Sequence, residues 1–142
     1  MGRTKNIYRA LIIIACVNTL AFMAHAGTLA SSNISGRYVR EAGDEESELK
    51  VKLIPGGRVH VTGVSYWGTK TRIESGVHVS DIEFKAPIKN NRVVFYDRHP
   101  MGKGIKYKIE MIFGKNKLTV KEEHSTGYFG MNVRFEGEYK KK

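Results

Sequence analysis

The chain has 142 residues, one cysteine and a formal net charge of +10. This length allows one ordinary domain, and a lone cysteine excludes both a disulfide framework and a cysteine-based zinc site. The basic excess favours anionic partners or surfaces, although net charge says nothing about the fold.

The N-terminal segment has the three parts of a secretory signal peptide. Residues 1–9 carry three basic side chains and no acid, and residues 10–24 are apolar apart from Asn18 and Thr19. Ala24-His25-Ala26 then places small residues where signal peptidase reads the chain. The apolar run is shorter than the ~20 residues of a membrane-spanning helix. We therefore expect a cleaved signal peptide at 1–26, a periplasmic or secreted protein, and no transmembrane segment.

Cys16 leaves a second kind of processing open. Ile13-Ile14-Ala15-Cys16 loosely resembles a bacterial lipobox, which would place a lipid on the cysteine. Against this, only about six apolar residues would precede Cys16, where signal segments carry about 7–15. Cleavage after Ala26 is therefore favoured. It leaves 21 Lys and Arg against 14 Asp and Glu, a net charge of +7.

The remainder reads as a short linker at 27–33 and one domain at 34–142. In this domain apolar residues alternate with polar ones between turn signals, which is the period of β-strands, and no convincing helix appears. The expected strands cover residues 34–40, 48–54, 58–66, 77–84, 92–97, 105–113, 117–123 and 132–140. Pro87 with Asn90-Asn91 is expected to close the turn after the fourth strand.

Two neighbouring strands change parity halfway. Val59 and Val61 are odd-numbered, whereas Val64 and Tyr66 are even-numbered, and the strand at 77–84 changes in the same way. One extra residue in a β-bulge exchanges the two faces of a strand. We expect bulges at both places, the alternative being strands that end early.

The first and last strands share the pattern apolar-x-Gly-x-Tyr, at Ile34–Tyr38 and Phe135–Tyr139. Glycine allows a coiled strand to bend, and the tyrosine is expected to pack at the rim. Pairing of these two strands would close the sheet and remove its edges. The expected fold is all-β: about eight antiparallel strands in an up-and-down, lipocalin-like small barrel. A two-sheet sandwich is the alternative.

Loop lengths predict which end of such a barrel binds a partner. The connections 41–47, 67–76, 98–104 and 124–131 are long and fall at one end, because successive connections of a meander alternate between ends. Long loops on a rigid scaffold and barrel mouths are common binding sites. The alternative for Trp67, Tyr128 and Phe129 is a hydrophobic lid over the interior. The candidate binding residues are Trp67, Lys70, Arg72, Arg98, His99, Lys103, Tyr128 and Phe129.

The chain carries no recognisable catalytic motif. It has no nucleophile-elbow serine, no phosphate-binding glycine loop and no H-E-x-x-H helix. His60 and His78 could both point outward from paired strands and begin a metal site, but such a site needs three or four ligands. Solvated surface histidines are expected instead. We therefore expect neither an enzyme nor a bound metal or cofactor, with an enzyme of unrecognised site as the alternative.

Three stretches carry a resemblance to known exported proteins: Pro55–Val61, Trp67-Gly68 and Gly130–Tyr139. In these the chain resembles uncharacterised bacterial periplasmic small β-barrel proteins, a likeness that implies no activity. Ser35-Gly36-Arg37-Tyr38 is also similar to the first strand of periplasmic lysozyme inhibitors, although that family spaces serine, glycine and tyrosine differently. A charge of +7 does not suit binding to basic lysozymes.

The function expected from the sequence is a monomeric, non-catalytic binding module. Its long-loop end would bind an envelope protein or an anionic envelope component such as lipid or cell-wall polymer, and nucleic acid is not expected outside the cell. An inhibitor or immunity protein against a cell-wall hydrolase is the alternative.

Overall fold

The computed structural model describes residues 31–68, 76–100, 102 and 104–142. The predicted signal peptide and most of the predicted linker lie outside these residues. The elements, in chain order, are α1 (Ser31–Ile34), β1 (Gly36–Ala42), β2 (Glu45–Ile54), β3 (Arg58–Trp67), β4 (His78–Lys89), β5 (Arg92–Arg98), β6 (Lys106–Gly114), β7 (Lys117–Glu123) and β8 (Gly137–Lys141).

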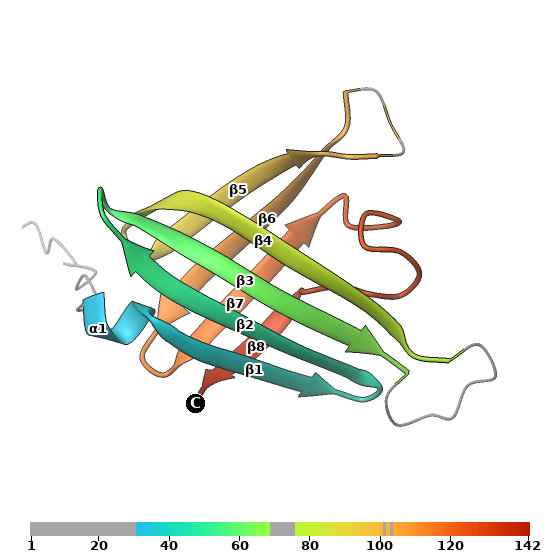
Figure 1. The fold of residues 1–142 in the computed structure, drawn as a ribbon, viewed down its shortest axis with the longest axis horizontal. Coiled ribbons are helices and arrows are strands. Elements are labelled where there is room, and N and C mark those ends of the chain that lie inside the picture. The colour runs from blue at the N-terminus through green and yellow to red at the C-terminus, as the bar shows by residue number, and fades with distance from the viewer. Residues whose placement is uncertain (1–30, 69–75, 101, 103) are drawn as a thin grey trace, which may run out of the picture.

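The strands form one closed antiparallel barrel in which each strand pairs with the next and β8 returns to β1 (Figure 1). The predicted eight-strand meander and its closure by the first and last strands are therefore confirmed. One difference is the single helical turn α1, which includes the end of the expected linker. It lies beside the tight turns at one end, opposite the long connections on the right of Figure 1.

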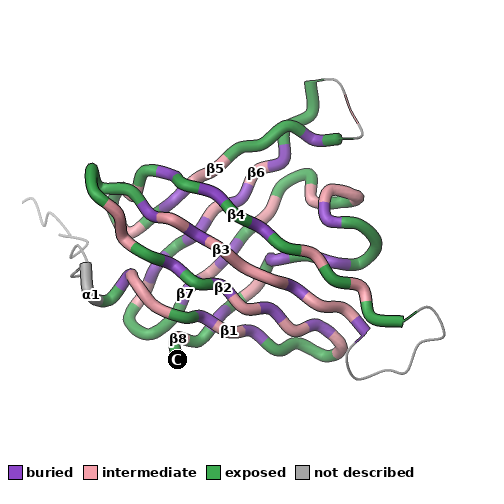
Figure 2. The backbone as a smooth tube through the Cα atoms, viewed as in Figure 1, coloured by how far each residue is buried: buried purple, intermediate pink, exposed green. Residues whose placement is uncertain are grey.

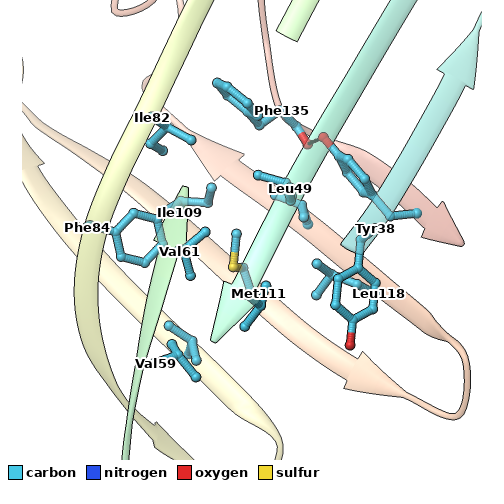
Figure 3. Close-up of a cluster of buried hydrophobic side chains, with 14 of the residues drawn as sticks. Tyr38, Leu49, Val59, Val61, Ile82, Phe84, Ile109, Met111, Leu118 and Phe135 are labelled. Carbon is cyan, nitrogen blue, oxygen red and sulfur yellow. Dashed lines mark hydrogen bonds between the residues drawn. The ribbon is translucent and has the colours of Figure 1, made fainter. Parts of the chain in front are cut away.

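The core fills the barrel with alternate side chains from its strands. Burial alternates along the strands in Figure 2, and the buried apolar side chains of several strands converge in Figure 3. In the expected strand 105–113, Tyr107, Ile109, Met111 and Phe113 are buried, whereas Ile105 is exposed just outside β6. The largest completely buried side chains are Tyr38, Tyr107, Tyr139, Phe135, Leu49, Ile109 and Met111.

The two Gly-x-Tyr motifs meet at the closing seam. Tyr38 and Tyr139 are 0% and 1% exposed, so they belong to the core and not to the rim. Each hydroxyl donates to the carbonyl four residues earlier, Tyr38 to Ile34 at 2.7 Å and Tyr139 to Phe135 at 2.8 Å. Burial raises the pKa of each tyrosine to about 12.

The expected bulges are wrong. The register between β3 and β4 runs without interruption from Arg58↔Pro87 to Trp67↔His78. The odd-numbered residues of β3 therefore face the interior along the whole strand, whereas Val64 and Tyr66 are not among the buried residues. Val77 and Val79 are 52% and 54% exposed for the same reason. The change from odd-numbered to even-numbered apolar residues marks the point where the side chains that line the barrel interior change from apolar to polar.

The barrel wall opens between β4 and β5. Only Ile88↔Val93 and Lys89↔Arg92 pair there, beside the two-residue Asn90-Asn91 turn. Pro87, predicted to lie in that turn, is instead inside β4. Because the amide of Ile88 donates to Gly57 on the β3 side, the nitrogen of Pro87 faces β5, where proline has no hydrogen to donate. The ladder ends there.

Candidate functional site

The end of the barrel with the long connections, here called the loop-bearing end, has three of them at 68–77, 99–105 and 124–136. The fourth expected loop, at 41–47, is wrong. β1 and β2 pair as far as Ala42↔Glu45, and a two-residue turn at Gly43-Asp44 joins them. Gly43 has φ 61°, a conformation that glycine adopts without steric cost. Glu45, inside the expected loop, is the first residue of β2 and only 8% exposed.

The interior at this end is polar. Arg40, Ser47, Ser65 and Ser80 are cross-strand neighbours along one row of the inner face. The hydroxyl oxygens of Ser47 and Ser65 lie 2.7 Å apart, and Ser65 donates to the Arg134 carbonyl at 2.7 Å. Buried polar groups are stable only when paired in this way.

Glu45 joins two arginines at the top of the polar interior. Arg40 Nη1 lies 2.7 Å and Arg134 Nη2 2.8 Å from its carboxylate oxygens. Burial by itself would raise the pKa of Glu45, but the hydrogen bonds and charges of Arg134 and Arg40 outweigh it and hold the pKa below its ordinary value. The cluster holds two positive charges and one negative charge. Among the described residues, Arg40 Nε is the only buried side-chain nitrogen or oxygen without a hydrogen-bond partner.

A pocket of about 670 Å³ opens beside this cluster. Trp67 is half-buried against the core, Met131 is 68% exposed, and the Arg134 side chain is 54% exposed. The pocket thus combines apolar contact area with a partly exposed cation. Its lining residues are Glu45, Trp67, Ser125, Thr126, Gly127, Gly130, Met131, Asn132, Val133 and Arg134.

Tyr128 and Phe129 fold into the barrel. The Tyr128 ring stacks on Tyr107 at 4.1 Å, and Phe129 meets Phe135 edge-on at 4.9 Å. The Tyr128 hydroxyl donates to the Asp97 carboxylate. Two of the three aromatic residues proposed as either anchors or a lid therefore occupy the lid position, whereas Trp67 lines the pocket.

Of the other predicted binding residues, the two that the structure describes, Arg98 and His99, do not line the pocket. His99 is 6% exposed, with Nε2 3.1 Å from the Thr126 carbonyl, so it supports the 124–136 loop. Arg98 is exposed on the β5–β6 hairpin. Lys70, Arg72 and Lys103 lie outside the described residues. The sequence analysis did not identify Arg40, Glu45 or Arg134 as site residues. A signal for the polar interior was present, because serines occupy inward positions of strands whose other inward positions hold apolar residues.

Glu122 fixes the chain where the last strand was expected. Residues 132–136 lie outside the sheet, so the prediction of a strand from 132 is wrong by five residues. The Glu122 carboxylate accepts the amides of Phe135 at 2.9 Å and Glu136 at 3.0 Å, and also the Tyr107 hydroxyl. These bonds replace the β-ladder. Burial raises the pKa of Glu122 despite them.

The histidines that could have begun a metal site are separated. His60 Nε2 lies 2.6 Å from Glu83, whereas His78 lies on the inner face beside Trp67, with ring centroids 5.5 Å apart. The expectation that both point outward is wrong for His78, because β4 has no bulge. In the part of the chain that the structure describes, no three His, Cys, Asp or Glu side chains are grouped to hold a metal.

No protein-family model, no curated protein and no solved structure matches this chain. Within the described ranges, none of the helices has the length and apolar character needed to cross a membrane.

Proposed function

We propose that the protein is a non-catalytic binding module of the cell envelope. At its loop-bearing end it takes up an anionic group of an envelope protein or other anionic envelope component. The observation that carries this proposal is the pocket of about 670 Å³, in which Trp67 and Met131 lie beside the Glu45–Arg134 ion pair. Mouths of small barrels are common ligand sites.

The exposed Arg134 and the charge of the cluster behind the pocket wall favour an anionic group. Arg40 and Arg134 share the single carboxylate of Glu45, so the cluster keeps one positive charge. Arg134 is half-exposed and can bind a carboxylate or phosphate oxygen without leaving Glu45, because a guanidinium has five N–H donors. An apolar group next to the anion would pack on Trp67 and Met131, and buried tryptophans are frequent binding anchors.

Capture of partners from an envelope extract on the immobilised exported protein tests the proposal. Trp67→Ala should weaken binding of the captured partner by about 1–3 kcal/mol. Arg134→Gln should slow association and reduce its dependence on salt. Lys115→Ala, in the Gly114–Asn116 turn at the other end, is the matched control and should leave binding unchanged.

Loss of the partner in Lys115→Ala, with retention in both pocket variants, would place the binding face elsewhere. Tyr128→Ala and Phe129→Ala should lower the unfolding free energy without changing affinity in the folded fraction, because both rings pack inside. Recovery of a cell-wall hydrolase as the partner, with loss of its activity, would turn the proposal toward inhibition.

A further inference from the structure

The tip of the β5–β6 hairpin presents two cations on one exposed face. Arg98 and Lys106 are direct cross-strand partners, and both are exposed. Among the described residues neither forms an ion pair with an acidic side chain. Like charges directly opposite each other destabilise a strand pair, so an external anion bound between them would relieve the repulsion.

Exposed apolar side chains accompany these cations. Tyr96 is 57% and Ile105 44% exposed, and both line a hollow of about 410 Å³ together with Arg98 and Lys106. Asp97 is the acidic residue of the lining, and its carboxylate already accepts the Tyr128 hydroxyl and the Arg98 amide. Two cations and one carboxylate leave the hollow with one excess positive charge beside its apolar walls.

The loop-bearing end also carries most of the exposed apolar side chains of the barrel. Six large apolar or aromatic side chains of the described residues are exposed, and five of them lie at the loop-bearing end: Val77, Val79, Tyr96, Ile105 and Met131. In Figure 1 the β5–β6 hairpin stands out from the barrel at this end. Among these, Tyr96 and Ile105 line one hollow and so form a contiguous exposed apolar area, of the kind that marks an interaction surface.

We propose that the tip of this hairpin docks on an anionic phospholipid surface. Arg98 and Lys106 contact lipid phosphates, while Tyr96 and Ile105 enter the interfacial layer. Basic side chains are attracted to anionic leaflets, and tyrosine with its polar hydroxyl suits the boundary between headgroups and acyl chains. A free phosphate would satisfy the cations alone, whereas a membrane also covers the two apolar side chains.

This surface differs from the proposed binding pocket, because the two hollows share no lining residue. Failure of one proposal therefore leaves the other standing. The barrel would sit with its loop-bearing end toward the membrane, and the pocket near Arg134 would face partners held at that surface.

Co-sedimentation of the exported protein with vesicles tests the proposal. One set contains phosphatidylcholine alone and the other equimolar phosphatidylcholine and phosphatidylglycerol. The protein should bind the anionic set preferentially. Arg98→Gln and Lys106→Gln should each weaken that binding about fivefold. Ile105→Ser should weaken it as well, with no change of charge.

A second pair of opposed lysines provides the matched control. Lys117 and Lys140 are also direct cross-strand partners, but they lie at the other end of the barrel. The double variant Lys117→Gln, Lys140→Gln removes the same charge as Arg98→Gln, Lys106→Gln and should retain vesicle binding. Circular dichroism and thermal unfolding establish that each variant is folded.

Three outcomes would overturn the proposal. The first is no preference for anionic vesicles. The second is equal loss of binding in both double variants, which would indicate unspecific attraction of a basic protein. The third is unchanged binding in Ile105→Ser together with full competition by soluble glycerol phosphate, which would identify a free anion as the ligand.

Discussion

At the scale of single residues, the loop-bearing end contains two shielded carboxylates whose pKa values are shifted in opposite directions. Glu45 lies between two guanidinium groups, and its pKa is lowered. Glu122 accepts two amides and a hydroxyl but forms no ion pair with any described residue, and its pKa is raised because burial dominates. The Glu45 carboxylate compensates the buried charge of Arg40. The Glu122 carboxylate accepts backbone amides that have no β-ladder partner.

Removal of the charge from Glu45 should be costly. Glu45→Gln leaves Arg40, whose side chain is 6% exposed, as a buried cation with no full counter-charge. We expect a loss of about 3 kcal/mol of unfolding free energy, measured by urea denaturation near neutral pH. Glu48→Gln is the control, because its ion pair with Arg37 is on the surface and should contribute less than about 1 kcal/mol. Equal losses would contradict the buried-pair argument.

The two carboxylates should also give opposite pH dependences. A lowered folded pKa means that the stabilisation by Glu45 is complete above 4.5, its ordinary value, and is lost as pH falls through the folded pKa. The raised pKa of Glu122 means that its stabilisation is complete below 4.5 and is lost as pH rises through the folded pKa. Urea denaturation from roughly pH 3 to 7 should show that Glu122→Gln removes the fall on the upper side. An unchanged fall in this variant would show that another group causes it.

At the scale of elements, β4 carries the weak point of the barrel wall. The strand pairs with β3 along ten residues and with β5 along two. The rings of Phe84 and Phe95 stack with their centroids 4.4 Å apart, beyond the short β4–β5 ladder. The two strands then separate, and a hollow of about 330 Å³ lies between them. Pro87 explains where the ladder stops. The outward charges of Asp81, Glu83 and Lys85 protect the resulting edge from pairing with other chains.

Amide hydrogen exchange along β4 should therefore alternate. Amides of Ile82, Phe84 and Ala86 face β3 and should exchange slowly, whereas those of Glu83 and Lys85 face the opening and should exchange quickly. Pro87→Thr restores an amide toward β5 and should yield a protected hydrogen at position 87. Uniform protection along β4 in the unaltered protein would mean that the wall is closed in solution.

At the scale of the whole molecule, closure depends on a quasi-symmetric contact between the first and last strands. Arg40 covers the Tyr139 ring from 5.8 Å, and Lys141 covers the Tyr38 ring from 5.9 Å. The Arg40 side chain also passes over Gly137, and the Lys141 side chain passes over Gly36, each occupying the space that a Cβ on the glycine would need. An added Cβ would come 2.6 Å from Arg40 Cδ at Gly137 and 2.5 Å from Lys141 Cε at Gly36.

These two glycines should differ in cost although their clashes are equally close. Gly137→Ala displaces Arg40, which is buried and bound to Glu45, and strains a backbone with φ 138°. We expect a loss of about 2 kcal/mol or more in unfolding free energy. Gly36 also has a positive φ, 158°, but it lies closer to the extended region, and the added Cβ would displace only the flexible end of Lys141, so Gly36→Ala should cost less. The order of the two thermal midpoints checks this, and the reverse order would contradict the role of Arg40.

The sequence by itself determined the strand number, the meander and the closing seam of this barrel. These follow from local properties: the two-residue alternation of a β-strand, the turn residues, and a Gly-x-Tyr motif at both ends of the domain. The end that carries most of the long loops, with Trp67 in it, could be predicted for the same reason. The β1–β2 connection could not, because Glu45 is held by Arg40 of β1 and by Arg134, which lies far away in the sequence.

Only the tertiary structure decided which side chains meet at the loop-bearing end. Arg134 alternates with apolar residues in the sequence, a pattern that relates it to no acidic partner, yet it binds Glu45, 89 positions away. It turns there because Glu122 takes the amides that a strand at 132–136 would have used. Val64 and Tyr66 likewise suggested a bulge, because alternation alone does not distinguish an extra residue from an interior that changes from valine to serine. The charges and partners of buried groups are set by barrel closure, which joins residues that no local pattern relates.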